Sequence, residues 1–507
     1  MGGALAIMSS NANVTSNFFS NNTSDMSEDT ITLNGVIADL ENNTFYDSLP
    51  VGLRDISVIF DSVINLRHNT FVDTGDLLMI DSSSVVNANA NVFQGGNCSV
   101  FSGGTFTDGG NNIAYNATGC VGANVDPQLS PMFSYAFVPL PTSPALDAYS
   151  APCAVNNDQF GTSRPQNGSC DIGAIEGAAS PNTTITTCSE SALNLALAGG
   201  GTVDFNIGAD CTIPFTFEKI IGTNTTIQNT SAFDVIFDGG NSVGLFTVNN
   251  GATLTLDNLT LQNAYSLQGG AVFNDESTLH VIDVVFDSNH TYTQDLFGLG
   301  IGDGGAIFSF GESLTTITGS TFTDNRATFG GAISVAPIWD NDTQMYASGQ
   351  LIVTNNTFSD NWAVNGGAII ATNIVTITDS LFDNNVSDLV ASVFYTGVEP
   401  TSEITILDSA FINHTSEYYN GVLAIWANGG VPVDFSVQGN RFINNASTTS
   451  FDSCSAITLY DEPSGSQLIG DLINNTFSGN SSTAGGGTVC IADDNGVIDI
   501  VHKWLVS

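Results

Sequence analysis

Residues 320–333 read STFTDNRATFGGAI, and residues 356–369 read NTFSDNWAVNGGAI. Both segments place an asparagine three residues after a phenylalanine and a glycine pair eight residues after the same phenylalanine. A spacing that is held in two copies indicates an internal repeat. A repeat is the first feature to look for, because a period of about 20 to 50 residues decides the fold.

The two signatures recur along the chain. Phe-x-x-Asn is found at Phe286/Asn289, Phe322/Asn325, Phe358/Asn361, Phe382/Asn385, Phe442/Asn445 and Phe477/Asn480. The glycine pairs are Gly269 with Gly270, Gly304 with Gly305, Gly330 with Gly331, and Gly366 with Gly367. One repeat spans about 25 residues, and the extra residues at Thr293 to Asp303 and at Ala336 to Gln350 are interpreted as loops.

Short runs of alternating, β-branched residues lie between the signatures, as in residues 314–318 and 374–378. This alternation predicts strands. Three strands per repeat would form one coil of a parallel β-helix, whose coils stack about 4.8 Å apart and place equivalent residues above one another. We expect the phenylalanines to stack through the core and the asparagines to bond to their counterparts at the turns. The glycines would occupy bends that need a positive φ or leave no room for Cβ.

The period breaks in the middle of the chain. We expect residues 1–125 to form the C-terminal coils of a first β-helix, residues 126–176 a non-repetitive end segment, and residues 177–186 a linker. In residues 187–200, a capping-box pattern from Thr187 to Glu190 precedes a short amphipathic run, which predicts a helix that caps the next solenoid. Residues 201–507 would be a second β-helix, truncated at its C-terminus.

The charge balance excludes several classes of function. Seven Lys and Arg face 50 Asp and Glu, and the net charge is −43. A chain of this charge cannot neutralise the phosphates of a nucleic acid, and it is repelled by anionic membrane surfaces. No apolar run approaches the roughly 20 residues of a transmembrane helix.

The eight cysteines form four pairs of close neighbours in the sequence: Cys98 with Cys120, Cys153 with Cys170, Cys188 with Cys211, and Cys454 with Cys490. No pair has the C-x-x-C spacing of a zinc or redox site, so disulfides in an oxidising compartment are favoured. Other pairings stay open. The chain begins without the features of a signal peptide, so we expect a fragment of an exported protein.

The Gly-Gly-Ala-Ile and Phe-x-x-Asn repeats resemble those of the chlamydial polymorphic outer-membrane proteins and of related bacterial surface β-helix proteins. The segments 143–148, 164–166 and 170–176 resemble the end segment of choice-of-anchor type surface proteins. The resemblance implies a right-handed β-helix, exported and displayed at the cell surface or outer membrane, with adhesion as its role and no catalytic residues. This chain departs from the pattern after Phe382, where Val390 and Tyr419 replace the glycine pair.

Parallel β-helices also support polysaccharide lyases and hydrolases. Lyases need a basic residue as proton acceptor and cations that neutralise the substrate, whereas the five arginines here are scattered. Hydrolases need two carboxylates about 5 to 9.5 Å apart. Asp324, Asp360 and the pair Asp493–Asp494 are interpreted as turn residues instead. Carboxylates beside an aromatic platform near Trp339 or Trp362 would favour an enzyme.

Metal and nucleophile sites have weak support in the sequence. The histidines lie far apart without ligand spacing, which predicts isolated surface roles for His68, His280, His290, His414 and His502. Calcium is possible because Asp and Asn offer hard oxygen ligands, but no calcium-binding motif is present. Residues 240–244 match a nucleophile elbow, yet a strand pattern follows them where the elbow requires a helix.

The sequence therefore predicts an all-β protein, a right-handed, single-stranded parallel β-helix in two tandem units. We expect an exported, cell-surface protein with an adhesin-like or structural role, no catalytic residue and no cofactor. Its partner would be an unidentified protein or glycan, bound at the two loops, since solenoid insertions often lie on the binding face. The alternative is a glycoside hydrolase or lyase on the same scaffold.

Overall fold

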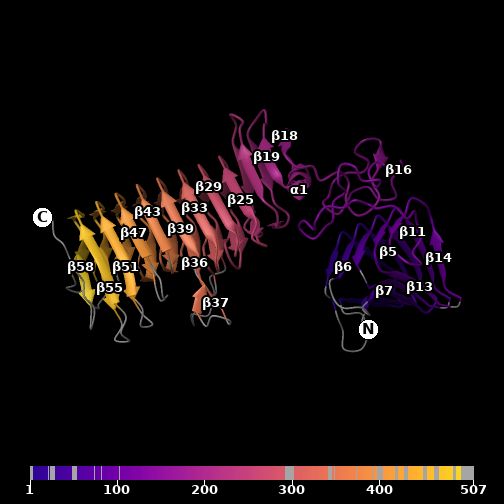
Figure 1. The fold of residues 1–507 in the computed structure, drawn as a ribbon, viewed down its shortest axis with the longest axis horizontal. Helices are drawn as coiled ribbons and strands as arrows, with labels where there is room; N and C mark the ends of the chain where they lie inside the picture. The colour runs from indigo at the N-terminus through magenta and orange to yellow at the C-terminus, as the bar shows by residue number, and fades with distance from the viewer. Residues whose placement is uncertain are drawn as a thin grey trace. The chain divides into compact units, whose positions relative to one another are not determined.

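A computed structural model describes residues 4–20, 22, 29–47, 54–73, 75–81, 83–101, 103–291, 302–340, 345–347, 349–372, 374–391, 393–396, 403–416, 421–427, 432–448, 454–461, 467–483 and 487–492. The chain divides into two compact units. Unit 1 comprises Met1–Thr183 and Ser191–Gly200, and unit 2 comprises Thr184–Glu190 and Gly201–Ser507. Each unit is built from strands that follow one another in sheets along its length (Figure 1).

Unit 1 has three parallel sheets of five strands. Sheet A contains β1 (Leu5–Met8), β4 (Asp29–Asn34), β7 (Arg54–Ile59), β10 (Asp76–Ile80) and β13 (Asn97–Val100). Sheet B contains β2 (Ala12–Thr15), β5 (Ile37–Glu41), β8 (Val63–Arg67), β11 (Val85–Asn89) and β14 (Thr105–Asp108). Sheet C contains β3 (Phe18–Ser20), β6 (Thr44–Asp47), β9 (Thr70–Asp73), β12 (Val92–Gln94) and β15 (Ile113–Tyr115). Each strand pairs with its equivalent one coil away, which is the connectivity of a parallel β-helix.

The rest of unit 1 has little regular structure. The antiparallel pair β16 (Tyr149–Ser150) and β17 (Ser169–Cys170) lies in the non-repetitive segment, and β18 (Thr183–Ile185) follows at the boundary with unit 2. The single helix of the described residues, α1 (Glu190–Gly199), packs Leu195 and Ala198 against a small apolar cluster of unit 1. The domain boundaries expected from the sequence, and a capping role for this helix, stay predictions.

Unit 2 has four parallel sheets. Sheet D contains β18, β19 (Gly201–Phe205), β22 (Thr225–Asn229), β25 (Thr253–Asp257), β29 (Thr278–Ile282), β33 (Leu314–Thr318), β39 (Gln350–Thr354), β43 (Ile374–Thr378), β47 (Glu403–Leu407), β51 (Pro432–Gln438) and β55 (Gln467–Ile473). Sheet E contains β20 (Cys211–Pro214), β23 (Val235–Asp238), β26 (Thr260–Gln262), β30 (Val285–Asp287), β34 (Thr321–Thr323), β40 (Thr357–Ser359), β44 (Leu381–Asp383), β48 (Ala410–Ile412), β52 (Arg441–Ile443) and β56 (Thr476–Ser478).

The other two sheets of unit 2 are sheets F and G. Sheet F contains β27 (Tyr265–Ser266), β31 (His290–Thr291), β35 (Arg326–Phe329), β41 (Trp362–Asn365), β45 (Val386–Val390), β49 (Thr415–Ser416), β53 (Ala446–Ser447) and β57 (Ser481–Ser482). Sheet G contains β21 (Lys219–Ile221), β24 (Phe246–Val248), β28 (Val272–Asp275), β32 (Ile307–Phe310), β36 (Ile333–Ala336), β42 (Ile369–Ala371), β46 (Phe394–Thr396), β50 (Leu423–Ala427), β54 (Ile457–Asp461) and β58 (Val489–Ala492).

From β25 onward, one coil of unit 2 runs through sheets D, E, F and G in that order, whereas the two coils before it run from sheet E directly to sheet G. The strand in sheet F is additional to the three that the sequence predicts. The turn between sheet E and sheet F contains a single left-handed residue, Asp324 or Asp360 in two of the coils (φ 52° and 57°). Both aspartates are therefore turn residues, as interpreted from the sequence.

The phenylalanines of the repeat form a continuous stack inside unit 2. Successive rings from Phe286 to Phe477 lie 4.7 to 5.1 Å apart between centroids and are nearly parallel. Unit 1 has its own stack through Phe19, Phe45, Phe71 and Phe93. Offset stacking of buried rings stabilises each coil against the next one beyond the burial of apolar area alone.

The glycine pairs serve two different needs. Gly304 and Gly330 have φ angles of 61° and 65°, where a side chain is strained. A Cβ on Gly305 would lie 2.1 Å from the carbonyl oxygen of Gly331, and one on Gly331 would lie 2.0 Å from that of Gly367. The first glycine of a pair thus supplies conformation, and the second allows neighbouring coils to approach.

The glycine pattern changes one coil further on. The backbone N–H of Gly366 donates to the carbonyl of Val390, so Ala391, with a φ of 47°, takes the left-handed position. The assignment of Val390 to this position was wrong by one residue, because the pairing of β41 with β45 shifts register between Ala363 and Asn365. Tyr419, assigned to the next coil, lies outside the described residues.

Four disulfides join Cys98 to Cys120, Cys153 to Cys170, Cys188 to Cys211, and Cys454 to Cys490. Each closes a short loop between neighbouring cysteines of the sequence. Disulfides form and persist in oxidising compartments. Within the described residues, no helix has the length and hydropathy that crossing a membrane requires.

Candidate functional site

The asparagines of the repeat are buried in a hydrogen-bonded ladder. The side chain of Asn325 accepts from the backbone N–H and the Nδ2 of Asn289, at 3.0 and 3.1 Å, and donates to the carbonyl of Phe286. The same contacts recur from Asn325 to Asn361 and from Asn361 to Asn385. These side chains satisfy backbone groups at the turns, so their role is structural.

Asn480 is the last asparagine of the ladder among the described residues, and its surroundings differ from those of the others. Its side chain accepts from the backbone N–H and the Nδ2 of Asn445, at 3.0 and 2.9 Å, and donates to the carbonyl of Phe442 at 2.8 Å. Asn445 is fully buried, whereas Asn480 and the neighbouring Phe477 are only half-buried. Asn480 therefore makes the same hydrogen bonds as the other asparagines of the ladder, although it is less buried than they are.

A histidine interrupts this ladder between Asn385 and Asn445. His414 is fully buried at the asparagine position, where its Nδ1 accepts from the backbone N–H of Asn385 at 2.9 Å and its own backbone N–H donates to Asn445. Burial lowers the pKa of His414 to about 3. The expectation of a surface role is thus wrong for His414, and it is also wrong for His68, which is buried in unit 1.

We expect His414→Asn to make unit 2 less sensitive to acid. The folded-state pKa of His414 lies below its unfolded value near 6.5, so the unfolded chain binds the extra proton between about pH 6.5 and 3. Stability from this group is present above pH 6.5 and is lost as the pH falls. Denaturant midpoints at pH 7 and pH 4.5, followed by tryptophan fluorescence, should therefore drop more in the parent than in the variant. Equal drops would contradict this account.

Several outward-facing side chains of sheet F are partly exposed and differ from coil to coil. At the first outward position of four successive strands stand Tyr265, His290, Arg326 and Trp362, which we call the sheet F strip. The rings of Tyr265 and His290 meet edge to face at 6.0 Å, and the guanidinium of Arg326 lies 5.3 Å from the Trp362 ring. Later coils carry Val386, Thr415, Ala446 and Ser481 at this position.

Carboxylates border the strip along the neighbouring turn. Asp324 and Asp360 lie two residues before Arg326 and Trp362, and Asp287 stands at the end of β30 one coil earlier. Burial raises the pKa of Asp324, as do the charges of Asp360 and Asp287, while Arg326 opposes them. The Nε1 of Trp362 donates to Asp388 at 3.0 Å. The strip thus combines rings, one guanidinium and carboxylates on an outer wall.

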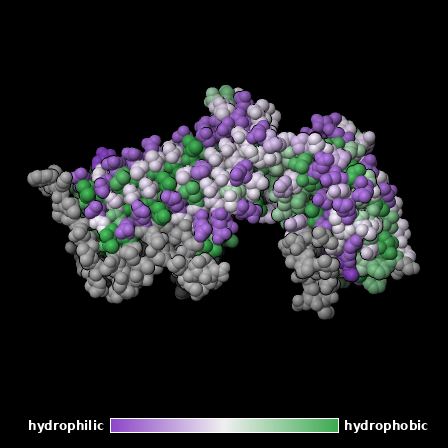
Figure 2. Space-filling view, viewed as in Figure 1, coloured by the Kyte–Doolittle hydropathy of each residue, from purple (hydrophilic) through white to green (hydrophobic). Residues whose placement is uncertain are grey.

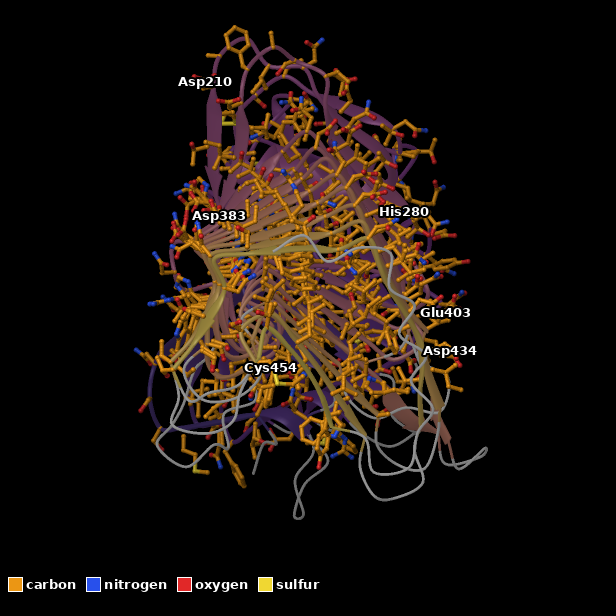
Figure 3. The ribbon with its side chains drawn as sticks, turned by 90° about the vertical axis from the view of Figure 1, so that its left-hand side faces the viewer. Asp210, His280, Asp383, Glu403, Asp434 and Cys454 are labelled. Atoms are coloured by element: carbon orange, nitrogen blue, oxygen red, sulfur yellow. A yellow bond between two sulfur atoms is a disulfide. The ribbon has the colours of Figure 1, made fainter. Side chains whose placement is uncertain are left out.

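The outer face of sheet D is mostly polar. His280 bonds to Thr316 across neighbouring strands at 2.7 Å, and Ile374 and Ile469 are exposed apolar residues of this sheet. Hydrophilic and hydrophobic residues are interspersed over the face of the molecule that Figure 2 shows. In the view of Figure 3, Asp383 of sheet E lies on one wall, and His280 and Glu403 of sheet D lie on another. Charged side chains are therefore spread over several walls.

The two predicted loops are described only in part. Most of residues 293–303 are outside the described part, but Asp303 is half-buried, accepts from Ser334 Oγ at 3.2 Å, and has its pKa raised to about 6 by burial. Within residues 336–350, β37 (Ile338–Asp340) and β38 (Met345–Ala347) pair as an antiparallel hairpin that projects from the solenoid (Figure 1). Trp339 is on β37, and its side chain is outside the described residues.

Unit 1 contains a buried cluster of charges. Arg164 pairs with Glu176 at 2.7 Å and donates to the carbonyls of Asp171 and Gly173. Burial raises the pKa of Asp171 to about 6. Burial, and then the charge of Arg164, lower the pKa of His68 to about 3. These buried charges thus hold residues 164–176 together, and Arg164 and the carbonyl of Asp171 also bond to Asn42 and His68 of the solenoid.

Unit 2 holds a second buried ion pair. The Lys219 ammonium lies 2.5 Å from Glu190 and 3.4 Å from the Phe217 ring centre, and burial lowers its pKa to about 8. Glu190 also accepts from the backbone and hydroxyl of Thr216, both at 2.8 Å. Its carboxylate therefore binds another strand region, whereas the sequence placed it in a capping box. The isolated Lys219 gave no signal of this role in the sequence.

The remaining candidates from the sequence are the motif at residues 240–244, His502, Asp493–Asp494 and a metal site. Residues 240–244 form a turn between β23 and β24, which are both strands, so they are no nucleophile elbow. His502 and Asp493–Asp494 lie outside the described residues. Among the described residues, no group of three or more His, Cys, Asp or Glu is arranged to hold a metal ion. A calcium site stays a prediction without support.

A comparison with protein families agrees with this geometry. Residues 243–442 match the family model described as the right-handed β-helix region. Two structures of the PL6 family alginate lyase AlyGC, one of them a mutant, align with TM-scores of 0.36 and 0.35 at 13% identity, covering 91% and 98% of this chain and 71% and 70% of theirs. A structural similarity this weak does not indicate a shared activity. No curated protein matches the chain. The sheets and the family match together show that the chain is a right-handed parallel β-helix protein.

Proposed function

We propose that the chain is an exported, non-enzymatic β-helix with an adhesin-like or structural role at the cell surface. The observation that carries the proposal is the sheet F strip, a set of partly exposed ring side chains and one exposed guanidinium placed on an otherwise repetitive outer wall. Side chains that are not needed for stacking the coils indicate a binding surface. Four disulfides support export, because they require an oxidising compartment.

The surroundings of the carboxylates favour binding over catalysis. Asp324 and Asp360 are exposed, at turns on the outside of the solenoid. A glycosidase needs a general acid whose site is shielded from water, beside a second carboxylate at a set distance. A lyase needs a base near neutral pH and a cation at the substrate carboxylate. Arg326 is the one guanidinium of the strip, and it stacks on Trp362.

The alternative is a polysaccharide-processing enzyme. The cluster of Asp324 with Asp287 and Asp360 is the observation in its favour, since hydrolases use neighbouring carboxylates as acid and base, and burial and the two neighbouring charges raise the pKa of Asp324. We expect no new reducing ends and no unsaturated products when the purified chain is incubated with xylan, cellulose, polygalacturonate or alginate. Products that disappear in Asp324→Asn would establish the enzyme and overturn the non-enzymatic proposal.

Surface display can be tested on the source cells. An antibody raised against unit 2 should label intact cells as strongly as permeabilised cells, because an adhesin-like protein must be accessible from outside. Labelling that requires permeabilisation would contradict the proposed role. A cytoplasmic marker antibody serves as the control for cell integrity.

A further inference from the structure

The four residues of the sheet F strip lie in a straight line. Each strand of a parallel sheet is displaced from the next by about 4.8 Å, so Tyr265 and Trp362, three strands apart, are separated by about 14 Å along the solenoid axis. The register is direct, Tyr265 with His290, His290 with Arg326, and Arg326 with Trp362. Because the four residues form a linear array, they match a ligand that is an extended chain.

The side chains of the strip combine apolar ring faces with groups that form hydrogen bonds. The rings of Tyr265 and Trp362 are partly exposed and offer apolar faces with one polar group each. Burial and the nearby Arg326 charge lower the pKa of His290, so its imidazole is neutral at pH 7 and can both donate and accept a hydrogen bond. Such groups suit a ligand with apolar ring faces and many hydroxyls.

The charges beside the strip limit which ligand can bind. Asp324 and Asp360 occupy the turn in two successive coils, Asp287 ends β30 in the coil before them, and Asp388 bonds to the Trp362 indole. Carboxylates accept hydrogen bonds from hydroxyl groups but repel other carboxylates and sulfates. With three carboxylates along one side and one guanidinium, the strip disfavours acidic polysaccharides.

We propose that the sheet F strip binds an extended, neutral polysaccharide laid along the solenoid axis. Sugar rings in an extended chain advance by about the distance between neighbouring coils, so successive rings meet successive residues of the strip. The apolar ring faces pack on Tyr265 and Trp362, and the hydroxyls bond to Arg326, His290 and the bordering carboxylates. This inference rests on the proposed function and names the ligand class of its binding surface.

The test is calorimetric titration of the whole chain with cellohexaose, xylohexaose, mannohexaose and chitohexaose, with hexagalacturonate as the acidic comparison. At least one neutral hexasaccharide should bind, more tightly than its disaccharide, because the strip is longer than two sugars. Trp362→Ala and Tyr265→Ala should each weaken that binding about tenfold, as expected for central aromatic contacts. Hexagalacturonate should not bind.

The control is Trp426→Ala. Trp426 is half-buried on sheet G, where it packs edge to face on Tyr460, so its replacement removes an equal side chain away from the strip. Binding should change by less than about twofold in this variant. The proposal is overturned if none of the four neutral hexasaccharides binds, if hexagalacturonate binds as tightly, or if both tryptophan variants lose affinity alike. Labelling of intact cells does not depend on the strip, so the surface role can stand when the glycan proposal fails.

Discussion

Replacing Phe358 with alanine is expected to lower the free energy of unfolding of unit 2 by about 3–5 kcal/mol. The ring is fully buried and lies 4.7 Å from both Phe322 and Phe382 in the stack. Its removal leaves a cavity between coils that the hydrogen-bonded strands cannot close. Since each coil contacts only its neighbours, the loss weakens two interfaces at once.

Tryptophan fluorescence measures this effect selectively, because the four tryptophans, at positions 339, 362, 426 and 504, all belong to unit 2. The guanidinium midpoint should fall in Phe358→Ala and stay nearly unchanged in Phe233→Ala, whose ring is 39% exposed on a turn. A similar shift in both variants would mean that the buried stack contributes no more than any phenylalanine of the chain.

Arg164→Ala is expected to destabilise the end segment of unit 1 by about 3–5 kcal/mol. The side chains of Arg164 and Glu176 are 0% and 1% exposed, so the substitution leaves the Glu176 charge buried without its guanidinium. The carbonyls of Asp171 and Gly173 lose a donor at the same time. Amide exchange in residues 158–176 should become more than about a hundredfold faster, while tryptophan fluorescence of unit 2 stays the same.

Arg67→Ala is the matched control in the same unit. Arg67 pairs with Asp39 and Glu41 at the surface, where its side chain is 31% exposed. Exposed pairs contribute about 0–1 kcal/mol, so exchange should change little. If both arginine variants speed exchange equally, the buried pair has no special role in holding the end segment.

The repeat made much of the fold predictable. Phe358 and Asn361 stand at fixed spacing from Gly366, and this phase is enough to imply stacked coils, since only a solenoid brings equivalent residues together at every period. The fourth sheet was not predictable, because its strands have two to five residues and Arg326 or Trp362 gives no alternation to detect. The shift from Val390 to Ala391 depends on a local irregularity in pairing, which spacing alone cannot show.

The candidate site was predictable only in part. Trp362 was singled out as an aromatic platform, but its neighbours Tyr265 and His290 come from coils 97 and 72 residues earlier, and only the register of sheet F aligns them. The burial of His414 at the asparagine position was also not predicted. It follows Phe411 by three residues, as the asparagines follow their phenylalanines, and the signal that could have found it was its phase in the repeat.

The residue-for-residue pairing of neighbouring coils also bears on how such a gene can change. Thr321–Thr323 pairs directly with Thr357–Ser359, so deletion of residues 321–356 would bring Phe358 onto Phe286 and Asn361 beside Asn289, like against like. Recombination between repeats can thus remove or add whole coils, and each coil changes the length of the solenoid by about 4.8 Å. An exchange that removes a fraction of a period would instead turn core residues outward, and selection would discard it.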